Sequence, residues 1–277
     1  MTGPGASTRL AAVIGSPVRH SLSPAMHNAA FAELGLDWVY LAFDVAPGTV
    51  AAAFAGARAL GLGGLSVTIP HKAAALAEVD DVTPVARAVG AVNTVVAQDG
   101  GRLLGDNTDG AGFLASLSDE GFDPDGRVCL VVGAGGAARA VVHALARAGA
   151  REVMVANRTP ERGETASAVA GDVGRATSAG EVVRADLVVN ATPLGLAGST
   201  PEDLPVDPTL LRPGQLVLDL VPNPAITPLM RAARQAGCRT AGGLGMLVHQ
   251  GALAFEQWTG RPAPLGVMRA AAVRALG

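Results

Sequence analysis

The sequence is poor in lysine: Lys72 is the only one among 21 lysine and arginine residues in a chain of 277. Arginine keeps its charge at every working pH, whereas lysine can release and regain a proton where its surroundings disfavour the charge. A lone lysine is therefore either a chance survivor on a solvated surface or a residue whose chemistry arginine cannot supply. On this argument alone the two interpretations stand level.

The chain also has few cysteines, a small net charge and no long apolar run. Two cysteines, Cys129 and Cys238, cannot form a disulfide framework, which favours a cytoplasmic location. A formal net charge of −3 implies no basic face, so nucleic acid is not an expected partner. The apolar run after Arg9 is too short for a signal peptide, and no run reaches transmembrane length, so no membrane association is expected. The five histidines show no metal-ligand spacing, and no metal site is expected.

What is plentiful is apolar sequence, at 49% of the chain, which suffices for about two folded domains. In the first part, strand-like and helix-like segments alternate, which predicts an α/β fold with a mainly parallel sheet. The predicted strands are residues 10–14, 38–43, 65–69 and a further one from 90, which enters a hairpin at 99–101. The predicted helices are residues 24–34, 50–60, 73–78 and 85–88.

Three places in this part carry polar residues with two interpretations each. Ser23 precedes Pro24 and reads as the N-cap of a helix, while Ser21 has no capping role, and two hydroxyls at a helix N-terminus suit a polyol or a carboxylate. Asn93 is either a turn residue or a ligand. Asp109 is either the cap of the helix that follows it or a functional carboxylate, and local sequence favours the cap.

Lys72 falls just beyond the predicted strand 65–69 and at the start of the predicted helix 73–78. Ligands bind at the carboxyl ends of strands in open α/β sheets. A positively polarised helix end disfavours an ammonium group beside it. This position therefore favours an acid–base lysine over a purely structural one.

A glycine-rich turn marks a second domain. The apolar strand 127–132 runs into Gly133-Ala134-Gly135-Gly136-Ala137-Ala138 and then a helix, which is typical of a dinucleotide-binding Rossmann unit. After the next strand, 152–156, come Asn157-Arg158-Thr159 and Arg162, where NAD enzymes usually carry an acidic residue. Two guanidinium groups suit a 2′-phosphate, so the predicted cofactor is NADP(H). The alternative is a glycine-rich turn without a ligand.

Together these segments resemble the shikimate dehydrogenase family over essentially the whole chain. The resemblance rests on residues 21–24 with His27 and Asn28, then on 67–72, 90–94, 105–110, 133–137 and 157–159, and on 245–248 with Gln250. It implies an α/β sandwich substrate domain, residues 1–108 completed by helices in 246–277, and an NADP-binding Rossmann domain, residues 109–245, with the substrate in the cleft between them. It also implies a cytoplasmic enzyme, monomeric or homodimeric, of chorismate and aromatic amino-acid biosynthesis.

The activity that the resemblance implies is the reversible, NADPH-dependent reduction of 3-dehydroshikimate to shikimate, with Lys72 and Asp109 as the catalytic pair. Ser21 and Ser23 are expected at the substrate carboxylate, and Thr68, Asn93 and Gln250 at its hydroxyls, along with Lys72 and Asp109. The expected cofactor residues are Gly133, Ala134, Gly135, Gly136, Ala137, Asn157, Arg158, Thr159, Arg162, Thr192, Leu220 and Gly243.

The chain departs from the family pattern in two places. Ser66 stands where many relatives have asparagine, and residues 219–224 lack a tyrosine that the family often has, since the only tyrosine is Tyr40. These departures leave a dehydrogenase that prefers quinate or an aminoshikimate-type substrate as the main alternative. A non-catalytic NADP-binding sensor is a further alternative, which the presence of both Lys72 and Asp109 disfavours.

Overall fold

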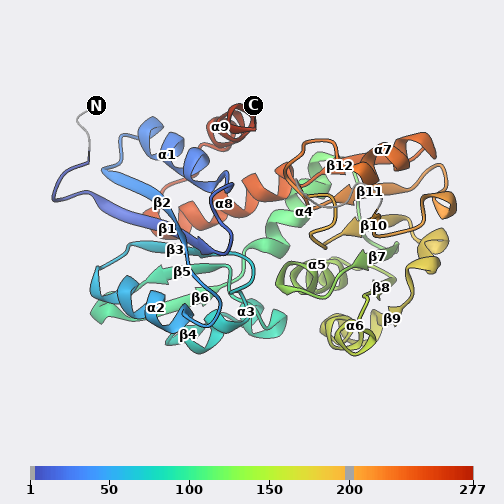
Figure 1. Ribbon diagram of the computed structural model, residues 1–277, viewed down its shortest axis with the longest axis horizontal. Helices are drawn as coiled ribbons and strands as arrows, with labels where there is room; N and C mark the ends of the chain where they lie inside the picture. Colours follow the sequence, from blue (N-terminus) through green and yellow to red (C-terminus); the bar gives the residue numbers. More distant parts are fainter. Residues whose placement is uncertain (1–3, 197–202, 277) are drawn as a thin grey trace. The chain divides into compact units, whose positions relative to one another are not determined.

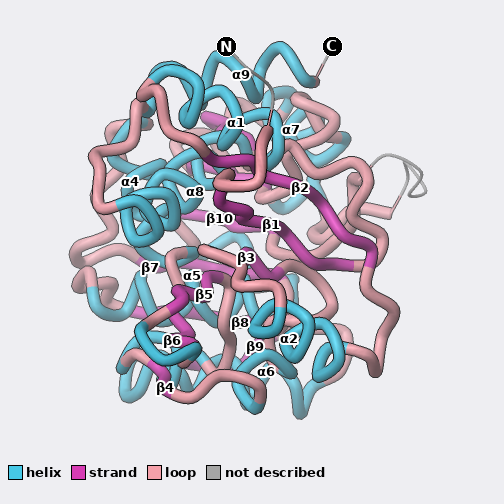
Figure 2. Tube along the Cα trace, turned by 90° about the vertical axis from the view of Figure 1, so that its left-hand side faces the viewer, coloured by secondary structure: helices cyan, strands magenta, loops and turns pink. Residues whose placement is uncertain are grey.

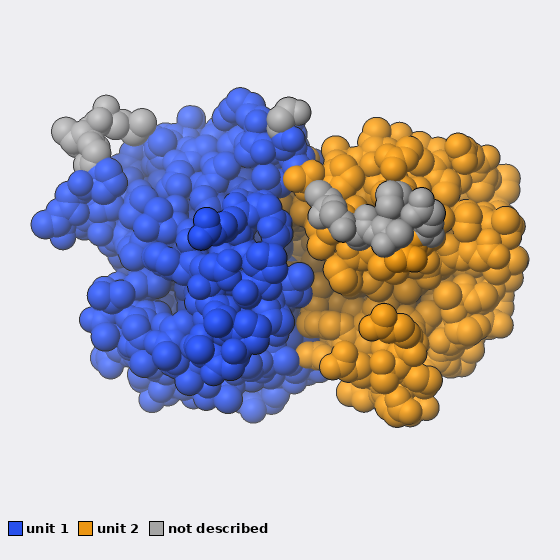
Figure 3. Space-filling model, in the orientation of Figure 1, with its two compact units in different colours: residues 1–108, 248–277 blue, residues 109–247 orange. Residues whose placement is uncertain are grey.

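The structure is a computed structural model and describes residues 4–196 and 203–276. The chain divides into two compact units, residues 1–108 with 248–277 and residues 109–247 (Figure 3). Each is an α/β unit built on its own six-stranded sheet, as the alternation of segments predicts. Within the described ranges, no helix is long and apolar enough to cross a membrane.

The sheet of the first unit is mixed, with three parallel and two antiparallel strand pairings. Its strands are β1 (Arg9–Gly15), β2 (Trp38–Asp44), β3 (Gly64–Val67), β4 (Asp81–Val82), β5 (Thr94–Ala97) and β6 (Leu103–Asp106). They lie in the order β2-β1-β3-β5-β6-β4, with β2 at one edge (Figures 1 and 2). β5 runs antiparallel to β3, and the predicted hairpin at residues 99–101 returns the chain so that β6 runs antiparallel to β5.

Helices cover both faces of this sheet. They are α1 (Ser23–Glu33), α2 (Val50–Ala59), α3 (Pro84–Val89), α8 (Leu244–Thr259) and α9 (Leu265–Ala275). On one face α2 and α3 pack on alternate strand residues such as Ile14 and Val67. On the other face α1 and α8 enclose an aromatic cluster, which we define as His27, Phe31, Trp38, Tyr40, Phe255 and Trp258.

The second unit has the Rossmann arrangement. Its strands are β7 (Val128–Val132), β8 (Glu152–Ala156), β9 (Gly174–Thr177), β10 (Leu187–Asn190), β11 (Leu216–Asp219) and β12 (Arg239–Gly242). All are parallel and lie in the order β12-β11-β10-β7-β8-β9. The order reverses between β7 and β10, and dinucleotides bind at such a switch point, outside the carboxyl ends of the strands.

Apolar strands buried on both faces hold this unit together, as expected for a parallel sheet. Its helices are α4 (Asp109–Asp119), α5 (Gly136–Arg147), α6 (Pro160–Ser167) and α7 (Pro228–Gln235). Helices α4 and α5 pack on one face of the sheet, and α7 with the 3₁₀ turn Ala179–Arg184 packs on the other.

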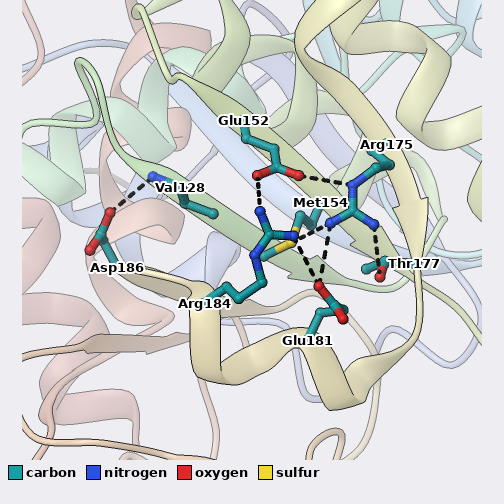
Figure 4. Close-up of polar contacts among 8 residues, drawn as sticks. All are labelled: Val128, Glu152, Met154, Arg175, Thr177, Glu181, Arg184 and Asp186. Carbon is teal, nitrogen blue, oxygen red and sulfur yellow. Dashed lines mark hydrogen bonds and ion pairs between the residues drawn. The ribbon is translucent and has the colours of Figure 1, made fainter.

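An ionic cluster lies at the amino-terminal edge of this sheet (Figure 4). Glu152 opens β8 and binds both Arg175 at 2.8 Å and Arg184 at 3.0 Å, and Glu181 also binds Arg184 at 3.0 Å. These side chains are partly exposed, so each pair contributes little to stability. The cluster joins β8, β9 and the 3₁₀ turn, at the edge opposite the dinucleotide loop.

Candidate active site

The N-terminus of α1 presents two serine hydroxyls, but the capping prediction for Ser23 was wrong. Ser23 is the first residue of the helix, the N-cap position is Leu22, and no side chain caps it there. Instead the backbone N–H of Ser23 donates to the Oγ of Ser21 at 3.3 Å. Ser21 therefore supports the turn into the helix, and the hydroxyl of Ser23 is left for other partners.

Asn93 is the centre of a buried polar cluster in the first unit. Its Nδ2 donates to the hydroxyl of Thr108 at 2.9 Å and to Oε1 of Gln250 at 3.2 Å. Its Oδ1 accepts from the backbone N–H of Thr108 at 2.8 Å and from the hydroxyl of Thr94 at 2.9 Å. Asn93 is 2% exposed and joins segments far apart in sequence, so it is no ordinary turn residue. Amides and hydroxyls arranged in this way can bind the hydroxyl groups of a polyol.

The segment from Thr68 to Lys72 is held by backbone bonds at both ends. The N–H of Thr68 donates to the carbonyl of Ile14, and the N–H of Val92 donates to the carbonyl of Lys72 at 2.8 Å. Lys72 therefore lies beside the strand end that carries Asn93. The imidazole of the intervening His71 is buried and bonds the carbonyl of Val45 at 2.7 Å.

The predicted helix 73–78 was wrong in kind and length. The structure has one turn of 3₁₀ helix, Ala74–Ala77, which begins two residues after Lys72. A single turn aligns too few peptide dipoles for a strong positive end. Lys72 therefore lies beside no strong positive helix end, although it does follow the strand as predicted.

Asp109 is the first residue of α4 and is 3% exposed. It follows Thr108 directly, and the backbone of Thr108 is bonded to Asn93. The positive end of α4, an eleven-residue helix, favours a carboxylate in its first turn.

The dinucleotide loop follows β7 at the switch point of the second sheet. Gly133 has φ +120°, and a Cβ there would lie 2.9 Å from the carbonyl oxygen of Ala191, which follows β10. Gly135 is the N-cap of α5, and a Cβ there would meet nothing within 4 Å. Gly133 thus packs closely on the segment after β10, while Gly135 leaves open space at the N-terminus of α5. A pyrophosphate can bind in such a space.

The end of β8 offers cations and no carboxylate. Arg158 and Arg162 are exposed, and neither side chain forms an ion pair with another described residue. The side chain of Asn157 donates to the carbonyl of Thr159 at 2.8 Å and fixes the turn between them. Free guanidinium groups at this position fit the 2′-phosphate of NADP.

A buried network at the ends of β10 and β11 was missed from the sequence. Asp219 is fully buried and accepts from Nδ2 of Asn190 at 2.9 Å and from the hydroxyl of Thr227 at 2.7 Å. Burial raises the pKa of Asp219, while its hydrogen bonds lower it. Oδ1 of Asn190 in turn accepts from the hydroxyl of Thr192 at 2.7 Å. The only sequence signal is a polar residue at the end of each apolar strand.

The predicted cofactor residues Leu220 and Gly243 lie together in the second unit. A Cβ on Gly243 would lie 2.2 Å from the carbonyl oxygen of Leu220, so only glycine permits this approach. The described residues contain no group of three or more potential metal ligands.

Three family profiles match the chain. They are the shikimate dehydrogenase substrate binding domain over residues 13–95, shikimate / quinate 5-dehydrogenase over 117–194, and the shikimate 5′-dehydrogenase C-terminal domain over 243–273. The matches follow one another along the chain and fall in both units.

Relatives and solved structures agree with the profiles. Shikimate dehydrogenase (NADP(+)) of Moorella thermoacetica is 53% identical, covering 98% of this chain and 95% of the relative. The structure of shikimate 5-dehydrogenase from Thermus thermophilus with NADP(H) and shikimate is 43% identical, covers 97% and 100% of the two chains and superposes with a TM-score of 0.90. Quinate dehydrogenase of Corynebacterium glutamicum, solved with NAD, is 32% identical, covers 96% and 99% and has a TM-score of 0.88.

Proposed function

The chain belongs to the shikimate dehydrogenase family, and from this premise we propose that it catalyses the reversible, NADPH-dependent reduction of 3-dehydroshikimate to shikimate. The reaction is a step of aromatic amino-acid biosynthesis. The observation that carries the proposal in the structure is the cluster of Asn93, Thr108 and Gln250, which supplies amides and a hydroxyl for a polyol beside the backbone of Lys72.

NADP(H) is the proposed cofactor. Gly133 to Ala137 form the loop and helix start for the pyrophosphate, and Asn157, Arg158, Thr159 and Arg162 hold the adenosine 2′-phosphate. Thr192, Leu220 and Gly243 lie on loops at the carboxyl edge of the same sheet and are proposed for the nicotinamide side. The exposed guanidinium groups of Arg158 and Arg162, which form no ion pair with another described residue, support NADP over NAD.

Lys72 and Asp109 are the proposed catalytic pair. When bound, NADPH supplies a hydride to the carbonyl carbon of the substrate. The carbonyl oxygen gains negative charge as this happens and needs a proton, which Lys72 Nζ donates. Asp109 accepts a hydrogen bond from the substrate hydroxyl. A positioned acid–base group is worth about 10²–10⁴-fold in rate.

The remaining polar residues are proposed to hold the substrate. The hydroxyls of Ser21 and Ser23 bind the carboxylate, and Thr68, Asn93 and Gln250 bind the ring hydroxyls. Their contacts with one another support this, because Asn93 and Gln250 are already oriented by hydrogen bonds before a ligand arrives.

The test is an absorbance assay at the NADPH band. Shikimate, quinate and aminoshikimate are each offered with NADP and then with NAD. The proposal expects the highest kcat/KM for shikimate with NADP. Faster turnover of quinate or aminoshikimate favours the alternative that Ser66 raises, and no turnover of any of them contradicts the dehydrogenase proposal.

The same proposal places the enzyme in the cytoplasm as a monomer or homodimer that binds no nucleic acid. Both thiols, Cys129 and Cys238, are free and buried, which supports a reducing compartment. Light scattering on the purified chain measures the oligomeric state, and a tetramer or larger assembly contradicts this part.

A further inference from the structure

Tyr40, the only tyrosine, is the one phenol in a cluster otherwise made of apolar and indole or imidazole rings. It lies on β2 with its side chain fully buried. Its hydroxyl donates to the Oγ of Ser66 on β3 at 2.7 Å, although β1 lies between these strands. A buried phenol needs a polar partner, and here that partner is a residue at the edge of the proposed substrate site.

Small residues make this reach across β1 possible. Tyr40 is in register with Ala11 on β1, which in turn is in register with Gly64 on β3, so all three face the same side. Ala11 and Gly64 leave room for large rings, and a Cβ on Gly64 would lie 2.5 Å from the Trp258 indole. The phenol ring therefore occupies a space that the sheet leaves for it, and its hydroxyl has a fixed position.

The ring of Tyr40 also packs against α1. The His27 ring stacks on the Tyr40 ring, with centroids 4.4 Å apart and planes 13° apart. Ser23 lies one turn before His27 on the same helix face. Burial raises the pKa of Tyr40 well above its ordinary value, against the smaller effects of Ser66 and Ser23. The phenol thus stays neutral and acts only through hydrogen bonds.

We propose that Tyr40 is a positioning residue that holds the hydroxyl of Ser66 for the substrate carboxylate. Because the Oγ of Ser66 accepts the phenol hydrogen, its own hydrogen is available to a further acceptor. Ser66 is only partly buried, so that acceptor can be a ligand, and an anion gains most from a hydroxyl donor. Ser66 becomes a carboxylate donor beside Ser23. This inference rests on the proposed function, since it assigns the carboxylate end of that substrate.

The test compares Tyr40→Phe, which removes one oxygen, with the wild type. We expect KM for shikimate to rise about threefold to tenfold, the effect of one hydrogen bond, with kcat within twofold and KM for NADP unchanged. Ser66→Ala should raise KM similarly, and the double variant should be little worse than either single one. With the methyl ester of shikimate, which lacks the negative charge, Tyr40→Phe should lose less than twofold in kcat/KM relative to the wild type.

A matched control separates positioning from packing. Trp258→Phe removes the indole N–H that donates to the carbonyl of Val95 at 3.0 Å, in the same aromatic cluster. This variant should lower Tm and leave KM for shikimate within twofold. The inference is overturned if KM for shikimate in Tyr40→Phe stays within twofold of the wild type. It is also overturned if the increases in KM caused by Tyr40→Phe and Ser66→Ala multiply in the double variant.

Calorimetric titration with shikimate keeps this inference separate from the proposed function. Wild type that binds shikimate without turning it over contradicts the catalytic proposal, and the ratio of Kd values for wild type and Tyr40→Phe still decides the role of Tyr40. Equal Kd values overturn that role alone. Absence of binding to the wild type overturns both.

Discussion

The side-chain amide of Asn93 donates to the side-chain oxygen of Gln250 at 3.2 Å, across 157 positions of sequence. The two residues belong to the same compact unit, because the C-terminal helices return to the N-terminal sheet. The polar cluster of the proposed substrate site is thus assembled from the two ends of the chain.

Replacing Asn93 should cost more stability than replacing Gln250. Asn93→Ala leaves the buried N–H of Thr108 without its acceptor, which costs about 1–3 kcal/mol in the free energy of unfolding. Gln250 is only partly buried, and Gln250→Ala should cost less than about 1 kcal/mol while raising KM for shikimate. Urea denaturation and initial rates measure both. Equal stability losses contradict the central place of Asn93.

His27 should make the protein less stable in acid. Complete burial lowers the pKa of His27 from 6.5 to about 3, and Nδ1 has no hydrogen-bond partner among the described residues. Below pH 6.5 the unfolded chain therefore binds a proton that the folded chain does not bind until about pH 3. As the pH is lowered through this window, the free energy of unfolding decreases by up to about 1.4 kcal/mol per pH unit. Above pH 6.5 His27 causes no such loss of stability.

His27→Phe removes this proton-binding difference and keeps an aromatic ring in the cluster. Its free energy of unfolding should fall less steeply than that of the wild type between pH 6.5 and 4. Denaturation series at several pH values give the two slopes, and parallel curves would mean that His27 takes up its proton in the folded state.

Arg158 should decide between NADP and NAD. Arg158→Ala removes a charged donor for the 2′-phosphate, so KM for NADP should rise about tenfold to hundredfold with no matching change for NAD. Arg175→Ala is the matched control, because that guanidinium is engaged by Glu152 at the opposite edge of the sheet (Figure 4). It should leave both cofactor constants unchanged. Equal losses for NADP and NAD would refute the 2′-phosphate role.

Substitution of Gly133 should reduce stability, whereas substitution of Gly135 should reduce cofactor binding. Gly133→Ala forces φ +120° on a residue with a Cβ and brings that Cβ within 2.9 Å of the Ala191 carbonyl, so it should lower stability by about 1–3 kcal/mol. Gly135→Ala meets no protein atom within 4 Å and should fold normally, yet raise KM for NADP by filling the pyrophosphate space. Thermal unfolding and cofactor kinetics separate the two, and normal NADP affinity in Gly135→Ala contradicts the assigned loop.

The Rossmann unit is the part that the sequence predicts best. Residues 152–156 are β8 as predicted, because an uninterrupted apolar run buried on both faces leaves a strong signal. The edge strands β9 and β12 and the polar helix α6 were not predicted. They are short or half-exposed, so their residues show little periodicity.

The first unit was harder to predict because pairings between distant segments decide it. β5 runs antiparallel to β3, a strand far from it in sequence. The carbonyl of Lys72 accepts from the N–H of Val92 instead of from a helical N–H, and only one 3₁₀ turn follows. Local sequence assigned Ser23 to a cap, although the N-cap position is Leu22 and no side chain caps the helix there. Neither Tyr40 nor Asp219 carries a local motif, and only the fold reveals their partners.

The most direct test of the account is the turnover of Lys72→Arg beside Lys72→Ala, measured with shikimate and NADP at saturating concentrations. As the proposed proton donor, Lys72 cannot be replaced by arginine, which keeps the charge but does not release a proton in the working pH range. Both variants should lose about 10²–10⁴-fold in kcat with KM for shikimate little changed. Near-normal kcat in Lys72→Arg would contradict the catalytic role of the chain's only lysine.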